Sequence, residues 1–260
     1  MSNLLEINNL SVDFPSRRGQ VAAVNKVSIS VAKGEVLGLV GESGAGKSTV
    51  GNSVINLLEP PGYISGGEII FDGTRIDQMS NEEMRKIRGA KIGTIFQDPQ
   101  TSLNPLMTIG KQLSETLVET LKISGSSALQ KSVELLDSVG IPNPDQRLNA
   151  YPHQFSGGMR QRVVIALALA GDPDLVIADE PTTALDVSIQ KQILDLIKSL
   201  CKQRNLGVII VTHDIGVIAE IADRVAVMYN GQLVEEGKVR QVLQKPKHDY
   251  TKSLISAVPS

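Results

Sequence analysis

Tryptophan is absent from this 260-residue sequence, and aromatic residues make up only 3% of it. This scarcity disfavours a surface that binds single-stranded nucleic acid by stacking bases on aromatic side chains. Lysine and arginine number 26 against 28 aspartates and glutamates, which gives a formal net charge of −2. The near balance offers no electrostatic reason to expect nucleic acid as the main partner.

Cysteine and long apolar runs are equally scarce. Cys201 is the only cysteine, which excludes an internal disulfide, a zinc site built from several cysteines and an iron–sulfur cluster. We expect its thiol to be inert and to lie on a helix. No apolar run approaches the roughly 20 residues of a membrane-spanning helix, and residues 1–9 lack the order of a signal peptide. The sequence therefore predicts a soluble, cytoplasmic chain that reaches a membrane only through partner subunits.

What the sequence does contain is an alternation of short apolar segments with helical ones. Apolar runs of the length and composition typical of strands occur at residues 4–9, 27–31, 36–40, 68–71, 92–96, 175–178, 208–211, 225–229 and 233–236. Between residues 97 and 171, leucine and valine recur at helical spacing. This order favours one α/β domain with a parallel sheet and a helical insert.

Residues 41–48 form the clearest motif, Gly-Glu-Ser-Gly-Ala-Gly-Lys-Ser, directly after the predicted strand 36–40. Glycines let backbone N–H groups approach phosphates without a Cβ in the way. Lys47 would reach the β- and γ-phosphates of a nucleotide, and Ser48 would offer its hydroxyl to Mg²⁺. The order strand, loop, helix favours a phosphate-binding P-loop over an ordinary glycine-rich turn.

A second glycine-opened helix start follows at residues 155–161, Phe-Ser-Gly-Gly-Met-Arg-Gln. The free N–H groups and the dipole of such a helix start favour an anion. Because one nucleotide in a P-loop needs only one such cradle, the second one predicts a site that a neighbouring copy completes.

Polar side chains stand at the exits of three predicted strands. Asp179 ends a buried strand, where a carboxylate is costly unless it faces a cation, and Glu180 beside it suits the polarisation of an attacking water. The alternative, two helix-capping carboxylates, is disfavoured by the preceding P-loop. His213, after the predicted strand 208–211, could hydrogen-bond a γ-phosphate through its imidazole. Gln97, after the predicted strand 92–96, could bind Mg²⁺ through its side-chain amide. Taken alone, a structural histidine and a surface glutamine remain the alternatives.

Together these residues resemble the nucleotide-binding subunit of an ABC (ATP-binding cassette) transporter, in the family's order and over essentially the whole chain. The resemblance implies a RecA-like P-loop NTPase core with a parallel sheet, an N-terminal antiparallel β-subdomain and an inserted α-helical subdomain. It divides the single ABC ATPase domain into a core at residues 1–96 and 171–238, the helical insert at 97–170 and a C-terminal helical tail at 239–260.

The family's motifs also imply a role for each matching residue. Walker A is residues 41–48, the Q-loop is Gln97, the signature is residues 155–161, Walker B is residues 175–179, and the D-loop is Ala184-Leu185-Asp186. The residues implied to act in ATP hydrolysis are Glu180, the switch histidine His213 and Lys47. Those implied to contact ATP are Phe14, Gly41, Glu42, Ser43, Gly44, Ala45, Gly46, Lys47, Ser48, Thr49, Gln97, Ser156, Gly157, Gly158 and Asp186. The implied Mg²⁺ ligands are Ser48, Gln97 and Asp179.

Phe14 lies where the family places an aromatic ring that stacks on adenine. A core phenylalanine beside the first strand is an open alternative, because stacking on a base needs no special spacing.

Three residues depart from the family's usual pattern. Phe155 and Met159 replace Leu and Gln of the signature, and Thr183 replaces the Ser before the D-loop alanine. The run Phe-Ser-Gly-Gly-Met-Arg-Gln-Arg is similar to one branch of importer subunits. That branch serves dipeptides, oligopeptides, nickel chelates, opines, glutathione or some oligosaccharides. Residues 97–105 and 248–254 resemble its coupling segment and its post-cassette helix. Longer members carry a cysteine-bearing C-terminal extension, so the chain resembles a short member or a shortened form.

The resemblance implies an ATPase that powers an importer with ATP and Mg²⁺, with di- or oligopeptide as the first choice of cargo. The expected partners are a second, different ATPase subunit packed head to tail, two integral membrane permease subunits and, indirectly, an extracytoplasmic solute-binding protein. Nucleic acid is not among them. The expected location is the cytoplasmic face of the inner or plasma membrane of a bacterium or archaeon.

Two other classes are disfavoured. Soluble ABC-type ATPases that act on nucleic acid or ribosomes usually carry two cassettes or a long coiled-coil insert, and this chain has neither. A regulatory cassette that binds ATP without cleaving it would be expected to lack Lys47, Glu180 or Ser156, and all three are present.

Overall fold

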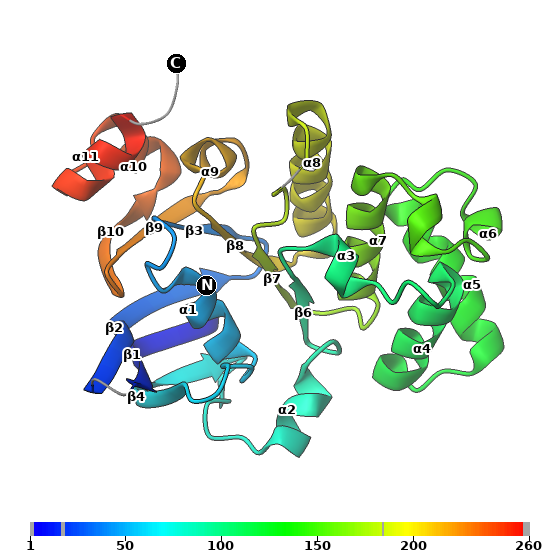
Figure 1. Cartoon of the computed structure of the whole chain (residues 1–260), viewed down its shortest axis with the longest axis horizontal. Coiled ribbons are helices and arrows are strands. Elements are labelled where there is room, and N and C mark those ends of the chain that lie inside the picture. Colours follow the sequence, from blue (N-terminus) through cyan, green and yellow to red (C-terminus); the bar gives the residue numbers. More distant parts are fainter. Residues whose placement is uncertain (1–2, 17–18, 184, 257–260) are drawn as a thin grey trace. The chain divides into compact units, whose positions relative to one another are not determined.

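A computed structural model describes residues 3–16, 19–183 and 185–256 of the chain (Figure 1). The chain forms two compact units, the first made of Met1–Met84 with Cys201–Ser260 and the second of Arg85–Leu200. The chain passes from one unit to the other inside two helices, after Met84 in α2 (Asn81–Ile87) and after Leu200 in α8 (Val187–Arg204). The division of the chain at residues 97 and 170 stays a prediction.

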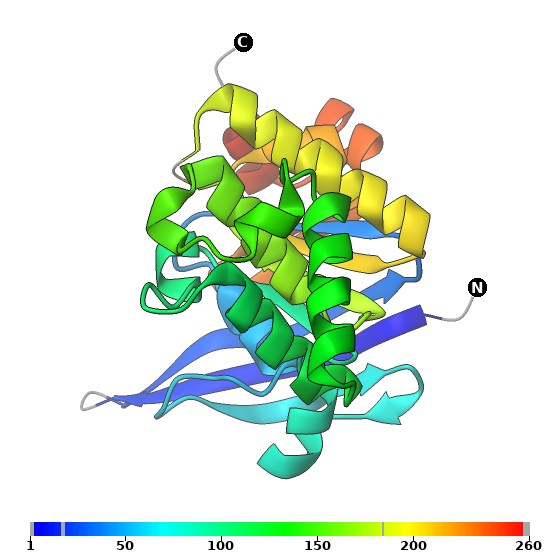
Figure 2. The same cartoon turned by 90° about the vertical axis from the view of Figure 1, so that its right-hand side faces the viewer.

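The first unit contains an antiparallel sheet, so the predicted N-terminal β-subdomain is confirmed. Its strand order is β2-β1-β4-β5, with β1 (Asn3–Ser16), β2 (Gly19–Ala32), β4 (Tyr63–Phe71) and β5 (Thr74–Arg75). Figure 2 shows β1 and β2, in dark blue, as two long strands lying side by side.

β1 and β2 are much longer than the apolar runs 4–9 and 27–31 that predicted them. The reason is an irregularity in each strand, one on either side of the Leu10–Val27 pair. Asn9 and Lys26 have φ angles of +50° and +52°, and the pairing register shifts beside them. Such bulges break the alternation of apolar and polar residues while the strand continues.

The first unit also holds the strands that carry the glycine loop. β3 (Val36–Val40) pairs in parallel with both β8 (Gly207–Thr212) and β9 (Arg224–Tyr229). β9 forms an antiparallel hairpin with β10 (Gln232–Lys238) around Asn230. Every residue of β3 and β8 is buried, which explains why both sequences are continuously apolar.

The helices of this unit are α1 (Lys47–Val54), α9 (Ile215–Ile221), α10 (Val239–Gln244) and α11 (Asp249–Ser256). α1 ends at Val54, and Asn56 soon after it adopts a left-handed φ of +50° that does not continue a helix.

The second unit combines two parallel strands with a group of helices. β6 (Ile92–Ile95) pairs in parallel with β7 (Leu175–Asp179). The helices between them confirm the helical segment expected there. They are α3 (Pro99–Ser102), α4 (Ile109–Leu121), α5 (Gly125–Ser138), α6 (Pro144–Arg147), the 3₁₀ turn η1 (Pro152–Gln154) and α7 (Gly157–Leu169). α4, α5 and α7, in green in Figure 2, pack against one another around fully buried leucines such as Leu113 and Leu117.

Cys201 on α8 is 2% exposed, and its Sγ donates to the Leu206 carbonyl oxygen at 2.9 Å. Burial raises the pKa of this thiol to about 11, so it stays protonated at neutral pH and the expected inert cysteine is confirmed. Among the helices of the described ranges, none has both the length and the apolarity that crossing a bilayer requires.

Candidate functional site

The glycine loop at residues 41–48 joins β3 to α1 in the first unit, and at two of its glycines a side chain would have no room. A Cβ on Gly41 would lie 2.2 Å from the Met228 carbonyl oxygen, and one on Gly46 would lie 2.4 Å from that of Ala23. Gly46 has a φ of +95° and is the N-cap of α1, so no side chain caps this helix. A helix start without a side-chain cap is a kind of site that suits an anion.

Lys47 closes the loop from inside. Its side chain is buried, and Nζ donates to the carbonyl oxygens of Gly41 and Glu42, each at 2.8 Å. The next residue, Ser48, is exposed, which leaves its hydroxyl accessible. A cation inside a ring of backbone groups, beside an accessible hydroxyl, fits a polyphosphate.

The remaining loop residues divide between the surface and the interior. Glu42, Ser43 and Gly44 are exposed, Ala45 is buried, and Thr49 is half-buried.

His213 leaves its strand at the same edge as the glycine loop. β3 and β8 run in parallel with Val40 opposite Thr212, so the residues that follow these two, Gly41 and His213, start from the same end of neighbouring strands. His213 is exposed. The next residue, Asp214, caps α9 by accepting the Gly216 N–H at 2.7 Å, which sets the direction of the chain after the histidine.

Phe14 is half-buried on β1, opposite Val21 of β2. A Cβ on Gly62 would lie 2.5 Å from its ring, so the ring packs directly on that glycine. Val21, across the strand pair, is 55% exposed. A ring that is only half covered agrees with both the core position and the adenine contact, and the alternatives stay open.

In the second unit, Gln97 and Glu180 are brought together. Ile95 at the end of β6 pairs with Ala178 of β7, so both chains leave the sheet at the same edge. Gln97 Nε2 donates to Glu180 Oε2 at 3.0 Å, and Thr183 Oγ1 donates to the same oxygen at 2.8 Å. Glu180 has a φ of +47°. Two donors and an uncommon backbone conformation define where this carboxylate points.

Thr183 is the residue that sequence reasoning missed. From the sequence, Thr183 is only a departure from the family's serine, and no hydrogen bond from it to Glu180 is predicted. The signal was its spacing, because a hydroxyl three residues after a carboxylate can reach it across a turn.

The predicted Mg²⁺ ligands all offer oxygen atoms. A serine hydroxyl, a glutamine amide and an aspartate carboxylate are hard ligands of the kind that Mg²⁺ takes together with phosphate oxygens. Asp179 is the last residue of β7, as predicted. Within the described ranges, no cluster of three or more His, Cys, Asp or Glu residues suits a metal by itself. Each of the three predicted ligands is, in its own chemistry, of a kind that suits Mg²⁺.

The signature segment begins α7 in the second unit. Ser156 is its N-cap, and Ser156 Oγ accepts the Met159 N–H at 3.3 Å. Gly157 is exposed, whereas Gly158 is buried, and a Cβ on Gly158 would lie 2.6 Å from Ile189 Cγ2. This second glycine is therefore needed for the approach of Ile189.

The departure at Phe155 has a packing reason. The ring is 3% exposed, and the Arg147 guanidinium carbon lies 5.6 Å from its centroid. A leucine would fill part of this position but would give no cation–π contact.

The D-loop is only partly described, since Ala184 lies outside the described residues. Asp186 Oδ1 accepts the Ser188 hydroxyl at 2.7 Å and the Ile189 N–H at 3.0 Å, at the start of α8. The Ser188 hydrogen bond, followed by that from Ile189, holds the pKa of Asp186 below its ordinary value. Asp186 is thus an ionised residue at a helix start.

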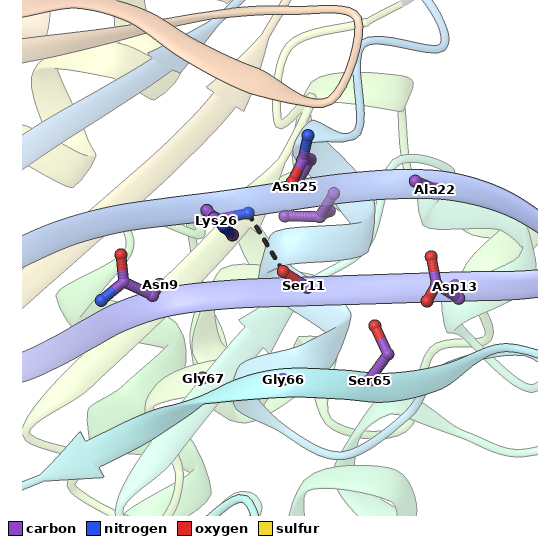
Figure 3. Close-up of a pocket in the computed structure, with 10 residues that line it drawn as sticks. Asn9, Ser11, Asp13, Ala22, Asn25, Lys26, Ser65, Gly66 and Gly67 are labelled. Carbon is purple, nitrogen blue, oxygen red and sulfur yellow. Dashed lines mark hydrogen bonds between the residues drawn. The ribbon is translucent and has the colours of Figure 1, made fainter.

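The first unit also has a hollow of about 710 Å³ over its antiparallel sheet (Figure 3). Figure 3 shows Asn9, Ser11 and Asp13 along β1, with residues of β2 and β4 on either side. The Lys26 N–H donates to Ser11 Oγ at 3.1 Å across it. None of the lining residues is among those implied to contact ATP.

The strand, glycine loop and helix of the first unit define a P-loop nucleotide-binding protein. Residues 24–183, more than half of the chain, match the family model described as ABC transporter. The chain therefore belongs to the ABC transporter family and is an ATP-binding cassette of that family, which confirms the resemblance seen in its motifs.

Curated relatives cover the whole chain. It is 52% identical over 261 residues to the oligopeptide transport ATP-binding protein OppD of Bacillus subtilis (strain 168). The matched region covers 100% of this chain and 73% of that relative. It is 50% identical over 260 residues to the dipeptide transport ATP-binding protein DppD of the same bacterium, across 100% and 78% respectively.

Solved structures agree. A dimeric structure of a post-hydrolysis state of the ATP-binding cassette MJ0796, bound to ADP and Pi, matches with a TM-score of 0.79 at 31% identity. The match covers 91% of this chain and 99% of the other. The predicted fold class is thereby confirmed.

Proposed function

We propose that this cassette hydrolyses ATP to power the uptake of di- or oligopeptides through a membrane transporter. The observation that carries the proposal is Lys47, buried inside a glycine loop with its ammonium group on two backbone carbonyls. The cargo class is supported by relatives that are named for oligopeptide and dipeptide transport.

ATP binding is proposed to use mainly the glycine loop. The N–H groups of residues 43–49 and the Lys47 ammonium would hold the phosphates, and Phe14 would support the adenine. Mg²⁺, when bound by Ser48, Gln97, Asp179 and phosphate oxygens, would neutralise part of the phosphate charge.

Hydrolysis is proposed to use Glu180 as the general base. A water molecule attacks the γ-phosphorus atom and passes a proton to the Glu180 carboxylate, while the bond to the bridging oxygen breaks and ADP leaves. The hydrogen bonds from Gln97 and Thr183 orient the carboxylate. His213 would donate a hydrogen bond to the γ-phosphate.

A second cassette is proposed to complete the site. Ser156, Gly157, Gly158 and Asp186 would be supplied to each ATP by the neighbouring copy, packed head to tail. The dimeric form named for MJ0796 supports such pairing. Closing the triphosphate between two preorganised anion sites excludes water and strengthens every charge interaction there.

Two permease subunits, and indirectly a solute-binding protein, are the remaining proposed partners. Leu106, directly after residues 97–105 that resemble the coupling segment, is 86% exposed. An exposed leucine at this position suits a contact with a permease. The cassette would then be a peripheral subunit at the cytoplasmic face of a bacterial or archaeal membrane.

The test is reconstitution in vesicles with the subunits that co-purify from the native membrane. We expect two permeases and a second cassette to accompany the chain, and ATP-dependent uptake of labelled di- and oligopeptides that Lys47→Ala abolishes. Uptake of a nickel chelate, opine or oligosaccharide instead would correct the cargo. Co-purification with a ribosomal or DNA-repair complex would overturn the transport function.

A further inference from the structure

The last helix of the first unit, α11, is fastened at its start to the β9–β10 hairpin. Glu235 of β10 accepts the Lys247 N–H at 2.8 Å with Oε1 and the His248 N–H at 3.0 Å with Oε2. Burial opposes ionisation of Glu235, but these backbone hydrogen bonds hold its pKa below the ordinary value. An ionised carboxylate thus clamps the segment that leads into α11, and Figure 1 shows α10 and α11 together beside β10.

The clamp brings Tyr250 to the glycine loop. The Tyr250 ring packs on Tyr229, the last residue of β9, with centroids 4.3 Å apart and an interplanar angle of 31°. Its Oη accepts the backbone N–H of Glu42 at 2.8 Å. Burial raises the pKa of Tyr250 above its ordinary value, so the phenol keeps its proton at neutral pH.

Glu42 is the residue through which this contact reaches the rest of the loop. Its N–H is held by Tyr250, while its carbonyl oxygen accepts Lys47 Nζ at 2.8 Å and the Ala45 N–H at 3.1 Å. The hairpin adds a second attachment, because the Gly231 N–H donates to the Ala45 carbonyl oxygen at 3.2 Å. The loop is therefore held from the side of the hairpin and the C-terminal helix.

We propose that Tyr250 is a positioning residue for the nucleotide loop. Its hydroxyl fixes the Glu42 peptide, and Glu42 in turn fixes Lys47 and the turn that presents the loop's N–H groups. A loop that is ordered before ATP arrives loses less conformational freedom on binding. Tyr250 acts through Glu42, and the inference rests on the proposed function in that this loop binds ATP.

The test is Tyr250→Phe in the full chain, which keeps the ring on Tyr229 and removes only the hydroxyl. We expect the affinity for ATP, measured by calorimetry, to fall about fivefold, as the loss of one net hydrogen bond of about 1 kcal/mol implies. Hydrogen exchange at the Glu42 amide should accelerate, since that N–H loses its acceptor. In the assembled transporter the KM for ATP should rise while kcat stays unchanged.

Lys252→Ala is the matched control, because Lys252 lies on the same helix and its Nζ pairs with the exposed Asp249 carboxylate at 2.7 Å. It should leave ATP affinity and Glu42 exchange unchanged. Wild-type affinity and unchanged Glu42 exchange in Tyr250→Phe would overturn the positioning role alone. A wild-type chain that binds no ATP would overturn the proposed function itself, and the inference with it.

Discussion

The two glycine-opened helix starts look alike in sequence but are built differently. At α1 the N-cap is Gly46, in a left-handed conformation with no side chain to satisfy the helix. At α7 the N-cap is Ser156, whose hydroxyl already accepts an N–H of its own helix. The first start carries a buried lysine, Lys47, whereas the first turn of α7 has an exposed glycine followed by a buried one.

Because of these differences in capping and charge, we infer that the two helix starts suit different tasks. The α1 start has no side-chain cap and carries its own cation, so it is equipped to hold a polyphosphate unaided. The α7 start is a finished, capped helix end with weaker anion-binding capacity of its own. It is suited to add a few donors to an anion that another loop already holds.

The largest effect is expected from Glu180→Gln, which separates ATP binding from turnover. Hydrolysis in the assembled complex should fall about 10³-fold, because an amide cannot accept the proton of the attacking water. ATP affinity should be retained, since the α1 loop is untouched. Phosphate release measures hydrolysis and calorimetry measures ATP affinity. Binding without cleavage would show that the α1 loop holds ATP independently of Glu180.

Asp174→Asn is the matched control for Glu180→Gln. Asp174 precedes β7, the strand that Glu180 follows, and makes a surface ion pair with Lys91 at 3.5 Å. Hydrolysis should therefore stay at the wild-type rate. A near-normal rate in Glu180→Gln would remove Glu180 from its proposed role.

Lys47→Ala should weaken ATP binding about 10- to 100-fold, the range expected when a charge-assisted hydrogen bond is lost. Calorimetry on the full chain measures it. Lys202→Ala, which removes an exposed lysine from α8, should leave the affinity unchanged. If Lys47→Ala binds ATP like the wild type, the two loops do not differ in the proposed way and the comparison is broken.

Ser156 offers two substitutions, of which only one should destabilise the fold. Ser156→Ala removes the N-cap and should lower the free energy of unfolding by about 1 kcal/mol, whereas Ser156→Asp keeps a capping side chain. Both should reduce hydrolysis by the paired cassettes, roughly tenfold for aspartate, since it places a negative charge near phosphate. Urea unfolding and phosphate release measure the two effects.

The Ser156 pair also tests the need for a neighbouring cassette. Full activity of Ser156→Asp, or of a strictly monomeric chain, would contradict the proposal that the α7 start of one copy completes the site of another.

The smallest effect is expected from Thr183→Val. It removes one of the two donors to Glu180 Oε2 and should lower kcat about threefold, somewhat less than a full net hydrogen bond. Thr183→Ser keeps the hydroxyl and should restore the rate. Equal kcat values for valine and threonine would show that the contact does not orient Glu180.

Much of the fold follows from local pattern. The predicted strand 36–40 has the same bounds as β3, and the strand 208–211 differs from β8 by one residue at each end. Both are buried throughout, and a continuously apolar run leaves little ambiguity. β1 and β2 were predicted too short, because the bulges at Asn9 and Lys26 interrupt the very alternation on which the prediction depended.

For the site, the motifs by themselves identified the candidate residues, because close phosphate contact requires glycines, a lysine and a hydroxyl at set spacings. Their roles toward nucleotide stay predictions. Only the tertiary structure decided which side chains meet across the chain. Tyr250 reaches Glu42 over 208 residues of sequence, since the β9–β10 hairpin carries it there. No local pattern encodes such a meeting, because it depends on how strands pair and helices pack, not on the order of neighbouring residues.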